Sequence, residues 1–68
     1  MTNVQRFRGS DGKSYSLTTN GNMQYLESNG YTLYSYDGRT NKTFKGNTPS
    51  ERVGDGNLLM SLISRLLG

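Results

Sequence analysis

The chain has 68 residues, of which only 31% are hydrophobic, and its formal net charge is +3. That length allows one small domain with a modest core, and the absence of cysteine and histidine excludes disulfides and a zinc cluster as stabilising elements. The mild positive charge permits contact with nucleic acid or an acidic protein but requires neither.

Turn-forming residue pairs recur through the first forty positions, at Asp11-Gly12, Asn20-Gly21, Asn29-Gly30 and Asp37-Gly38. Asn-Gly and Asp-Gly accept the positive φ angles of a type I′ turn, and the runs between them are rich in the strand-forming residues Tyr, Thr and Leu. The pattern predicts a five-stranded antiparallel β-meander over about residues 4–45. The expected strands are Val4–Arg8, Ser14–Thr19, Met23–Glu27, Tyr31–Tyr36 and Lys42–Lys45.

The last third of the chain is expected to form a loop and then a helix. Residues 46–56 contain Pro49 and three glycines, which is typical of a loop. Residues 57–67 place apolar side chains over roughly 200° of a helical wheel, with Asn57 as the expected N-cap and Gly68 at the C-terminal end. We therefore predict one α+β domain over residues 1–68, with a C-terminal amphipathic α-helix packed on one face of the sheet.

Two-residue turns fix strand register, so the two sheet faces can also be predicted. The helix is expected to cover Tyr15, Leu17, Leu26, Leu33 and Phe44. The opposite face is expected to carry Met23, Tyr25, Tyr34 and Tyr36. Phe7 has two possible positions: a two-residue turn places it on the tyrosine face, whereas a three-residue loop with a bulge places it beneath the helix.

The residues available for chemistry favour a non-catalytic protein. Histidine and cysteine, the commonest general base and the thiol nucleophile, are both absent. Each aspartate precedes a glycine in an expected turn, and the two glutamates stand far apart in the sequence. We expect no enzymatic activity, no cofactor and no metal site.

The tyrosine face instead predicts a protein-binding surface, because tyrosine gives a large contact area at low entropic cost. The expected contacts are Tyr25, Tyr34, Tyr36 and Met23, with Arg39 at their rim. A small chain of this composition resembles the accessory inhibitors encoded by phages and mobile elements. That resemblance implies a module that occupies a surface of a larger protein partner.

The apolar arc of the helix is wider than one sheet face needs, which predicts a second contact. We expect either a homodimer with Leu58, Met60 and Leu67 at its interface, or insertion of the helix into a groove of a host protein.

Two alternatives use the basic residues. In the first, the sheet closes into a small β-barrel that binds single-stranded nucleic acid through Arg6, Arg8, Lys42 and Lys45 together with the tyrosines. In the second, arginines between subunits bind a small anionic ligand. The N-terminal residues contain no apolar run, so we expect neither a signal peptide nor membrane contact, and a cytoplasmic location.

Overall fold

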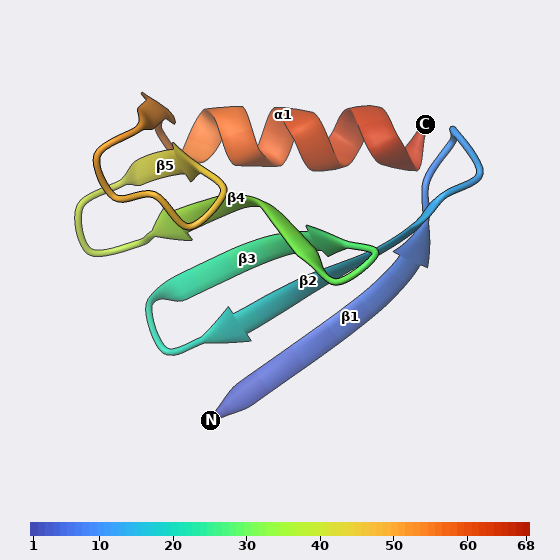
Figure 1. The fold of residues 1–68 in the computed structure, drawn as a ribbon, viewed down its shortest axis with the longest axis horizontal. Coiled ribbons are helices and arrows are strands. Elements are labelled where there is room, and N and C mark those ends of the chain that lie inside the picture. The colour runs from blue at the N-terminus through green and yellow to red at the C-terminus, as the bar shows by residue number, and fades with distance from the viewer.

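The computed structural model describes all of residues 1–68 and shows one antiparallel sheet with one helix (Figure 1). The elements in chain order are β1 (Thr2–Arg8), β2 (Ser14–Asn20), β3 (Met23–Ser28), β4 (Tyr31–Asp37), β5 (Lys42–Lys45), β6 (Arg52–Gly54) and α1 (Gly56–Leu67). The predicted α+β architecture is therefore confirmed, but the sheet has six strands and not five.

Each strand pairs with its neighbour in sequence, and the spatial order is β1-β2-β3-β4-β5-β6. β1 and β6 form the two edges, so the sheet is open and the barrel alternative does not match the fold. The additional strand, β6, lies within the predicted loop and pairs with β5 at Phe44↔Arg52 and Thr43↔Gly54. Its three residues are too few to show an alternating pattern, which explains why the sequence indicates a loop there.

Two-residue turns connect β2 to β3 and β3 to β4. In the β3–β4 turn, Asn29 and Gly30 have φ angles of +53° and +78°, as a type I′ turn requires. The β2–β3 turn has Gly21 and Asn22 at its centre, and only Gly21 has a positive φ, as in a type II′ turn. This turn lies one residue later than expected. The pairing therefore shifts by two residues, which keeps the side chains of β2 and β3 on their predicted faces.

A β-bulge in β4 reverses the faces predicted for the second half of the sheet. Leu26 pairs with Tyr34 and not with Leu33, because the register shifts by one residue at this point. Leu33 is the additional residue, and the positions that follow it on β4 face the side opposite to the prediction. Tyr34 and Tyr36 consequently pack against the core beneath α1, and the prediction that they face away from the helix is wrong.

The reversal continues into β5, because β5 takes its register from β4. Phe44 pairs with Ser35 and faces away from the helix, so its predicted place beneath the helix is also wrong. Thr43 takes the helix side instead and is fully buried. Its Oγ1 donates a hydrogen bond of 2.6 Å to the Asp55 carbonyl, which satisfies the buried hydroxyl beside the start of α1.

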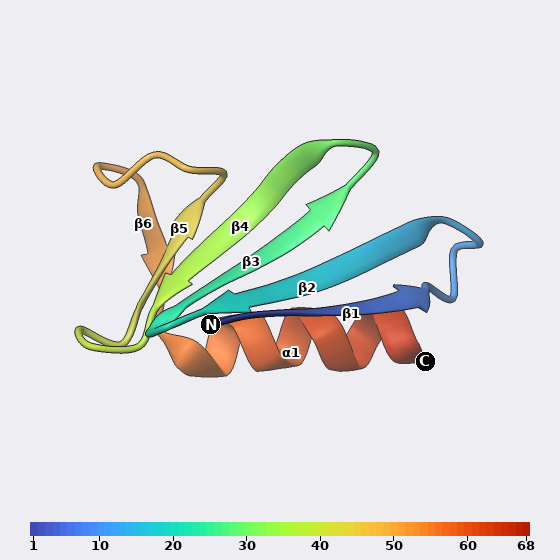
Figure 2. The same cartoon turned by 90° about the horizontal axis from the view of Figure 1, so that it is seen from below.

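The core lies between α1 and the sheet face that this helix covers (Figure 2). Its buried hydrophobic residues are Tyr15 together with Leu26 and Leu59, which are each 1% exposed. Partly buried side chains surround these three: Phe7, Tyr34, Tyr36, Ile63 and Leu66. Each large apolar side chain contributes about 1.5–3 kcal/mol when fully buried, so a core of this size stabilises the fold only modestly.

The loop between β1 and β2 determines the position of Phe7. Arg8 pairs with Ser14, which leaves residues 9–13 as a five-residue loop. Phe7 pairs with Tyr15, and their rings stack with centroids 5.6 Å apart at an interplanar angle of 19°. Phe7 therefore lies on the helix side, the second of its two predicted positions, although the loop is longer than that alternative assumed.

The helix begins one residue earlier than predicted and has a different N-cap. The Asp55 carboxylate accepts a 2.9 Å hydrogen bond from the backbone N–H of Asn57, so Asp55 is the N-cap residue. Gly68 ends the helix as predicted, and its N–H donates to the Ser64 carbonyl at 3.1 Å.

Candidate binding face

We call the sheet surface that faces away from α1 the open face, because the helix covers only the opposite surface (Figure 2). The strand register assigns to it alternate side chains from β1 to β5. They include Val4, Arg6, Arg8, Ser14, Ser16, Thr18, Met23, Tyr25, Glu27, Thr32, Ser35, Asp37, Lys42 and Phe44. This face combines aromatic, polar and charged groups, and it contains two hollows.

The first hollow, which we call the apolar hollow, has a volume of about 290 Å³. Tyr25 pairs with Ser35, and Ser35 pairs with Phe44, so two aromatic side chains flank a small one across three strands. Ser35 is only 4% exposed, since its larger neighbours shield it from solvent. The lining residues are Met23, Tyr25, Ser35, Asp37, Phe44, Asn47 and Pro49.

The loop between β5 and β6 forms one wall of the apolar hollow through Asn47 and Pro49. Hydrogen bonds to β4 hold this loop: the Gly46 N–H donates to the Leu33 carbonyl at 2.8 Å, and the Asn47 amide donates to Thr32 Oγ1 at 3.2 Å. The wall is therefore attached to the bulged part of β4. The same bulge that turns Ser35 toward the open face also provides the carbonyl that anchors the loop.

Asp37 gives the apolar hollow one negatively charged group. Its carboxylate accepts a 2.9 Å hydrogen bond from the backbone N–H of Arg39, and this bond is the main reason that the pKa of Asp37 is lowered. The Arg39 guanidinium lies 3.5 Å from the same oxygen and lowers the pKa further. Arg39 is mostly exposed, so this ion pair contributes little to stability, and its guanidinium lies at the rim of the open face.

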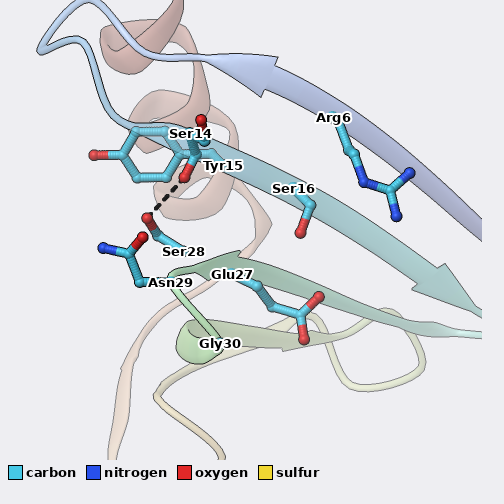
Figure 3. A pocket seen from close by; sticks show the side chains of 8 residues that line it. All are labelled: Arg6, Ser14, Tyr15, Ser16, Glu27, Ser28, Asn29 and Gly30. Carbon is cyan, nitrogen blue, oxygen red and sulfur yellow. Dashed lines mark hydrogen bonds between the residues drawn. The ribbon is translucent and has the colours of Figure 1, made fainter.

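The second hollow, which we call the polar hollow, has a volume of about 310 Å³ and lies over β1, β2 and β3 (Figure 3). Arg6 and Glu27 project toward it from the two outer strands, with Ser16 on the strand between them. At one end, the Ser28 hydroxyl donates to the Ser14 carbonyl at 2.8 Å. The lining residues are Arg6, Ser14, Tyr15, Ser16, Glu27, Ser28, Asn29 and Gly30.

The predicted contact residues are divided between the two sides of the sheet. Met23 and Tyr25 lie on the open face as predicted, and Arg39 lies beside Asp37 at its edge. Tyr34 and Tyr36 belong to the other side, where they pack against the core. Phe44, which the sequence indicated as a core residue, takes their place on the open face because the bulge reverses the alternation.

The residues predicted for nucleic-acid binding are not brought together. Arg6 and Arg8 lie on the edge strand β1, whereas Lys42 lies on β5, four strands away. At a spacing of about 4.8 Å between neighbouring strands, β1 and β5 are separated by about 19 Å across the sheet. Lys45 pairs with Tyr34 and therefore belongs to the helix side of the sheet.

The residues predicted for the oligomer interface also differ in their surroundings. Met60 and Leu67 are 62% and 63% exposed on α1, so both are accessible to a partner. Leu58 is half-buried, and it packs so closely over Gly54 that a Cβ built on this glycine would lie 2.7 Å from Leu58 Cδ2. Leu58 therefore has a contact within its own chain.

No group of three or more acidic side chains is arranged to hold a metal ion. The helix has neither the length nor the continuous apolar character that a membrane crossing requires. No protein-family model, curated protein or solved structure matches the chain. The functional assignment therefore depends on the geometry of the open face.

Proposed function

We propose that this chain is a small non-catalytic protein-binding module whose larger protein partner covers the open face around the apolar hollow. The observation that supports this function is the position of Met23, Tyr25 and Phe44, which lie together on the sheet surface that α1 leaves uncovered. Aromatic side chains in a shallow hollow are typical anchors of protein interfaces. By occupying a surface of that partner, the module would act as an inhibitor, in the manner of inhibitors encoded by phages.

The lining of the apolar hollow indicates what the partner contributes. Its volume of about 290 Å³ suits one or two apolar side chains of the partner. The polar groups around it are the Ser35 hydroxyl, the Asn47 amide and the Asp37 carboxylate, which provide both donors and acceptors. We expect an apolar side chain of the partner to enter between Tyr25 and Phe44 while its backbone or polar groups bond to the rim.

Single-stranded nucleic acid is the second candidate, because the open face combines aromatic rings with the basic residues Arg6, Arg8 and Lys42. Bases would stack on the rings and phosphates would contact the cations. However, Glu27 and Asp37 place two carboxylates on the same face, between the separated basic groups. These carboxylates repel phosphates, so the face favours a protein partner.

The test compares two tyrosines that differ in position. Tyr25→Ser removes an aromatic side chain from the apolar hollow, whereas Tyr31→Ser removes a tyrosine that is 74% exposed and does not line it. We expect the wild-type chain and Tyr31→Ser to retain the same host protein on an affinity resin, and Tyr25→Ser to bind it about 30-fold more weakly, as for a central interface tyrosine. Circular dichroism checks that both variants are folded.

Equal binding of the partner by both variants would contradict the assignment to the open face. Recovery of oligonucleotide instead of protein, with an affinity that falls steeply as salt increases, would favour the nucleic-acid candidate. Tyr34→Ser is unsuitable for this test, because Tyr34 packs against the core and its removal would destabilise the fold.

A further inference from the structure

The polar hollow places opposite charges on either side of a small residue. Arg6 pairs with Ser16, and Ser16 pairs with Glu27, so the three side chains form one row across β1, β2 and β3 (Figure 3). At about 4.8 Å per strand, the backbones of Arg6 and Glu27 are about 10 Å apart. The two charged groups do not form an ion pair with each other, since the chain contains only the pair between Arg39 and Asp37.

The charged groups in the polar hollow retain free hydrogen-bonding capacity. Glu27 Oε1 accepts a 2.7 Å hydrogen bond from Thr18 Oγ1, which orients the carboxylate and leaves Oε2 without a partner in the chain. The Arg6 guanidinium donates no hydrogen bond within the protein, and its planar N–H groups suit a carboxylate. The hollow is thus lined by a cationic donor and an anionic acceptor, each with hydrogen-bonding groups free for a ligand.

We propose that the polar hollow binds a small zwitterion, with its carboxylate on Arg6 and its ammonium group on Glu27. A free amino acid is the simplest ligand with this chemistry. The volume of about 310 Å³ is at the small end of the range for ligand sites. Because Ser14, Ser16 and Asn29 also line the hollow, a polar side chain on the ligand fits better than an apolar one.

The arrangement selects against ligands that carry only one charge. An anion at Arg6 is repelled by Glu27, and a cation at Glu27 is repelled by Arg6, whereas a zwitterion satisfies both groups. This ligand site goes beyond the protein-binding function, because the apolar hollow has a separate set of lining residues. Either site can therefore be tested without the other.

The probe is L-glutamine, added to isotopically labelled protein at constant ionic strength while amide shifts are followed by NMR. We expect saturable shifts at residues 14–16 and 27–30, with a dissociation constant in the millimolar range. N-acetyl-L-glutamine lacks the ammonium group and L-glutaminamide lacks the carboxylate, so each is expected to bind at least tenfold more weakly.

Variants test the residues in the same assay. Arg6→Gln and Glu27→Gln are each expected to weaken L-glutamine binding at least tenfold. Arg8→Gln is the matched control, because Arg8 is two residues away on the same strand, donates to the Gly12 carbonyl at 2.8 Å and does not line the hollow. Arg6 is exposed and has no partner in the chain, so its replacement tests the site independently of folding.

Three results would overturn the assignment: no saturable shift with L-glutamine, equal binding of either single-charge analogue, or an equal loss of binding in Arg8→Gln. Any of these results would leave the partner-binding experiment with Tyr25→Ser unaffected.

Discussion

At the scale of single residues, Asp11 ties the β1–β2 loop to the core. One carboxylate oxygen accepts a hydrogen bond from the Tyr15 hydroxyl, and the other accepts one of 2.9 Å from the Lys13 N–H. The tyrosine bond is the main reason that the pKa of Asp11 is lowered from 3.8, and the same bond raises the pKa of Tyr15 above 10.0. The ionised aspartate and the neutral tyrosine are thus the forms that favour the fold.

These pKa shifts predict how stability depends on pH. Because the pKa of Asp11 is lower in the folded state, its contribution is present above 3.8 and is lost as the pH falls through the folded value. The contribution of Tyr15 is present below 10.0 and is lost as the pH rises through its raised value. We expect Asp11→Asn to reduce the loss of stability in acid, measured as the urea midpoint at a series of pH values.

Glu51→Gln is the control for this experiment, because the Glu51 side chain makes no hydrogen bond or ion pair in the chain. If Asp11→Asn and Glu51→Gln have the same acid dependence as the wild type, the Asp11–Tyr15 hydrogen bond does not contribute to acid stability.

At the scale of elements, the start of α1 depends on contacts from residues that are distant in sequence. The Asn41 side-chain oxygen accepts hydrogen bonds of 3.0 Å from the Gly56 N–H and from the Tyr36 hydroxyl. Asp55 caps the following N–H, and its carbonyl accepts from Thr43. Strands β4 and β5 thereby position the first turn of the helix.

The two candidate N-caps give a direct prediction. Asp55→Ala removes the carboxylate that accepts from the Asn57 N–H, and we expect it to lower the free energy of unfolding by about 0.5–2 kcal/mol. Asn57→Ala is the matched control, because Asn57 occupies an exposed position within the first helical turn. Its expected effect is close to zero in urea denaturation followed by circular dichroism. A larger loss in Asn57→Ala than in Asp55→Ala would contradict this N-cap assignment.

At the scale of the whole molecule, the chain divides its apolar residues between a small core and two accessible surfaces. The core contains only three buried hydrophobic residues, while Met23, Tyr25 and Phe44 lie on the open face and Met60 and Leu67 on the outer side of α1. A domain with so little buried apolar area gains stability when a partner covers the remainder. Binding and folding are therefore expected to be energetically linked.

Homodimerisation through α1 stays a prediction that concentration dependence can test. Met60 and Leu67 are seven residues apart, which places them on the same side of the helix. A dimer dissociates on unfolding, so we expect the thermal midpoint to rise with protein concentration and Met60→Ser to remove this dependence. Val53→Ser is the control, because Val53 is 47% exposed on β6 and outside the helix. A midpoint independent of concentration would indicate a monomer.

Local sequence chemistry determined the strand–turn pattern and the terminal helix. Asn29-Gly30 accepts two consecutive positive φ angles, and this preference alone predicts the β3–β4 turn. The apolar arc over residues 57–67 likewise predicts the helix, since its period is a property of the segment itself. The candidate contacts Met23 and Tyr25 lie in the part of the sheet before the bulge, so their face follows from alternation.

Only the tertiary structure decided which side chains face the helix after Leu33. A bulge has no distinctive residue requirement here, and one additional residue exchanges Tyr34 and Ser35 between the two faces. The exchange lets Tyr34 and Tyr36 pack around Leu26 and Leu59. Strand β6 likewise depends on pairing with β5, a contact between segments that local propensity does not encode. The alternation of residue types in the sequence therefore assigned residues to strands. Packing against α1 selected the strand register, and the register determines on which face of the sheet each side chain lies.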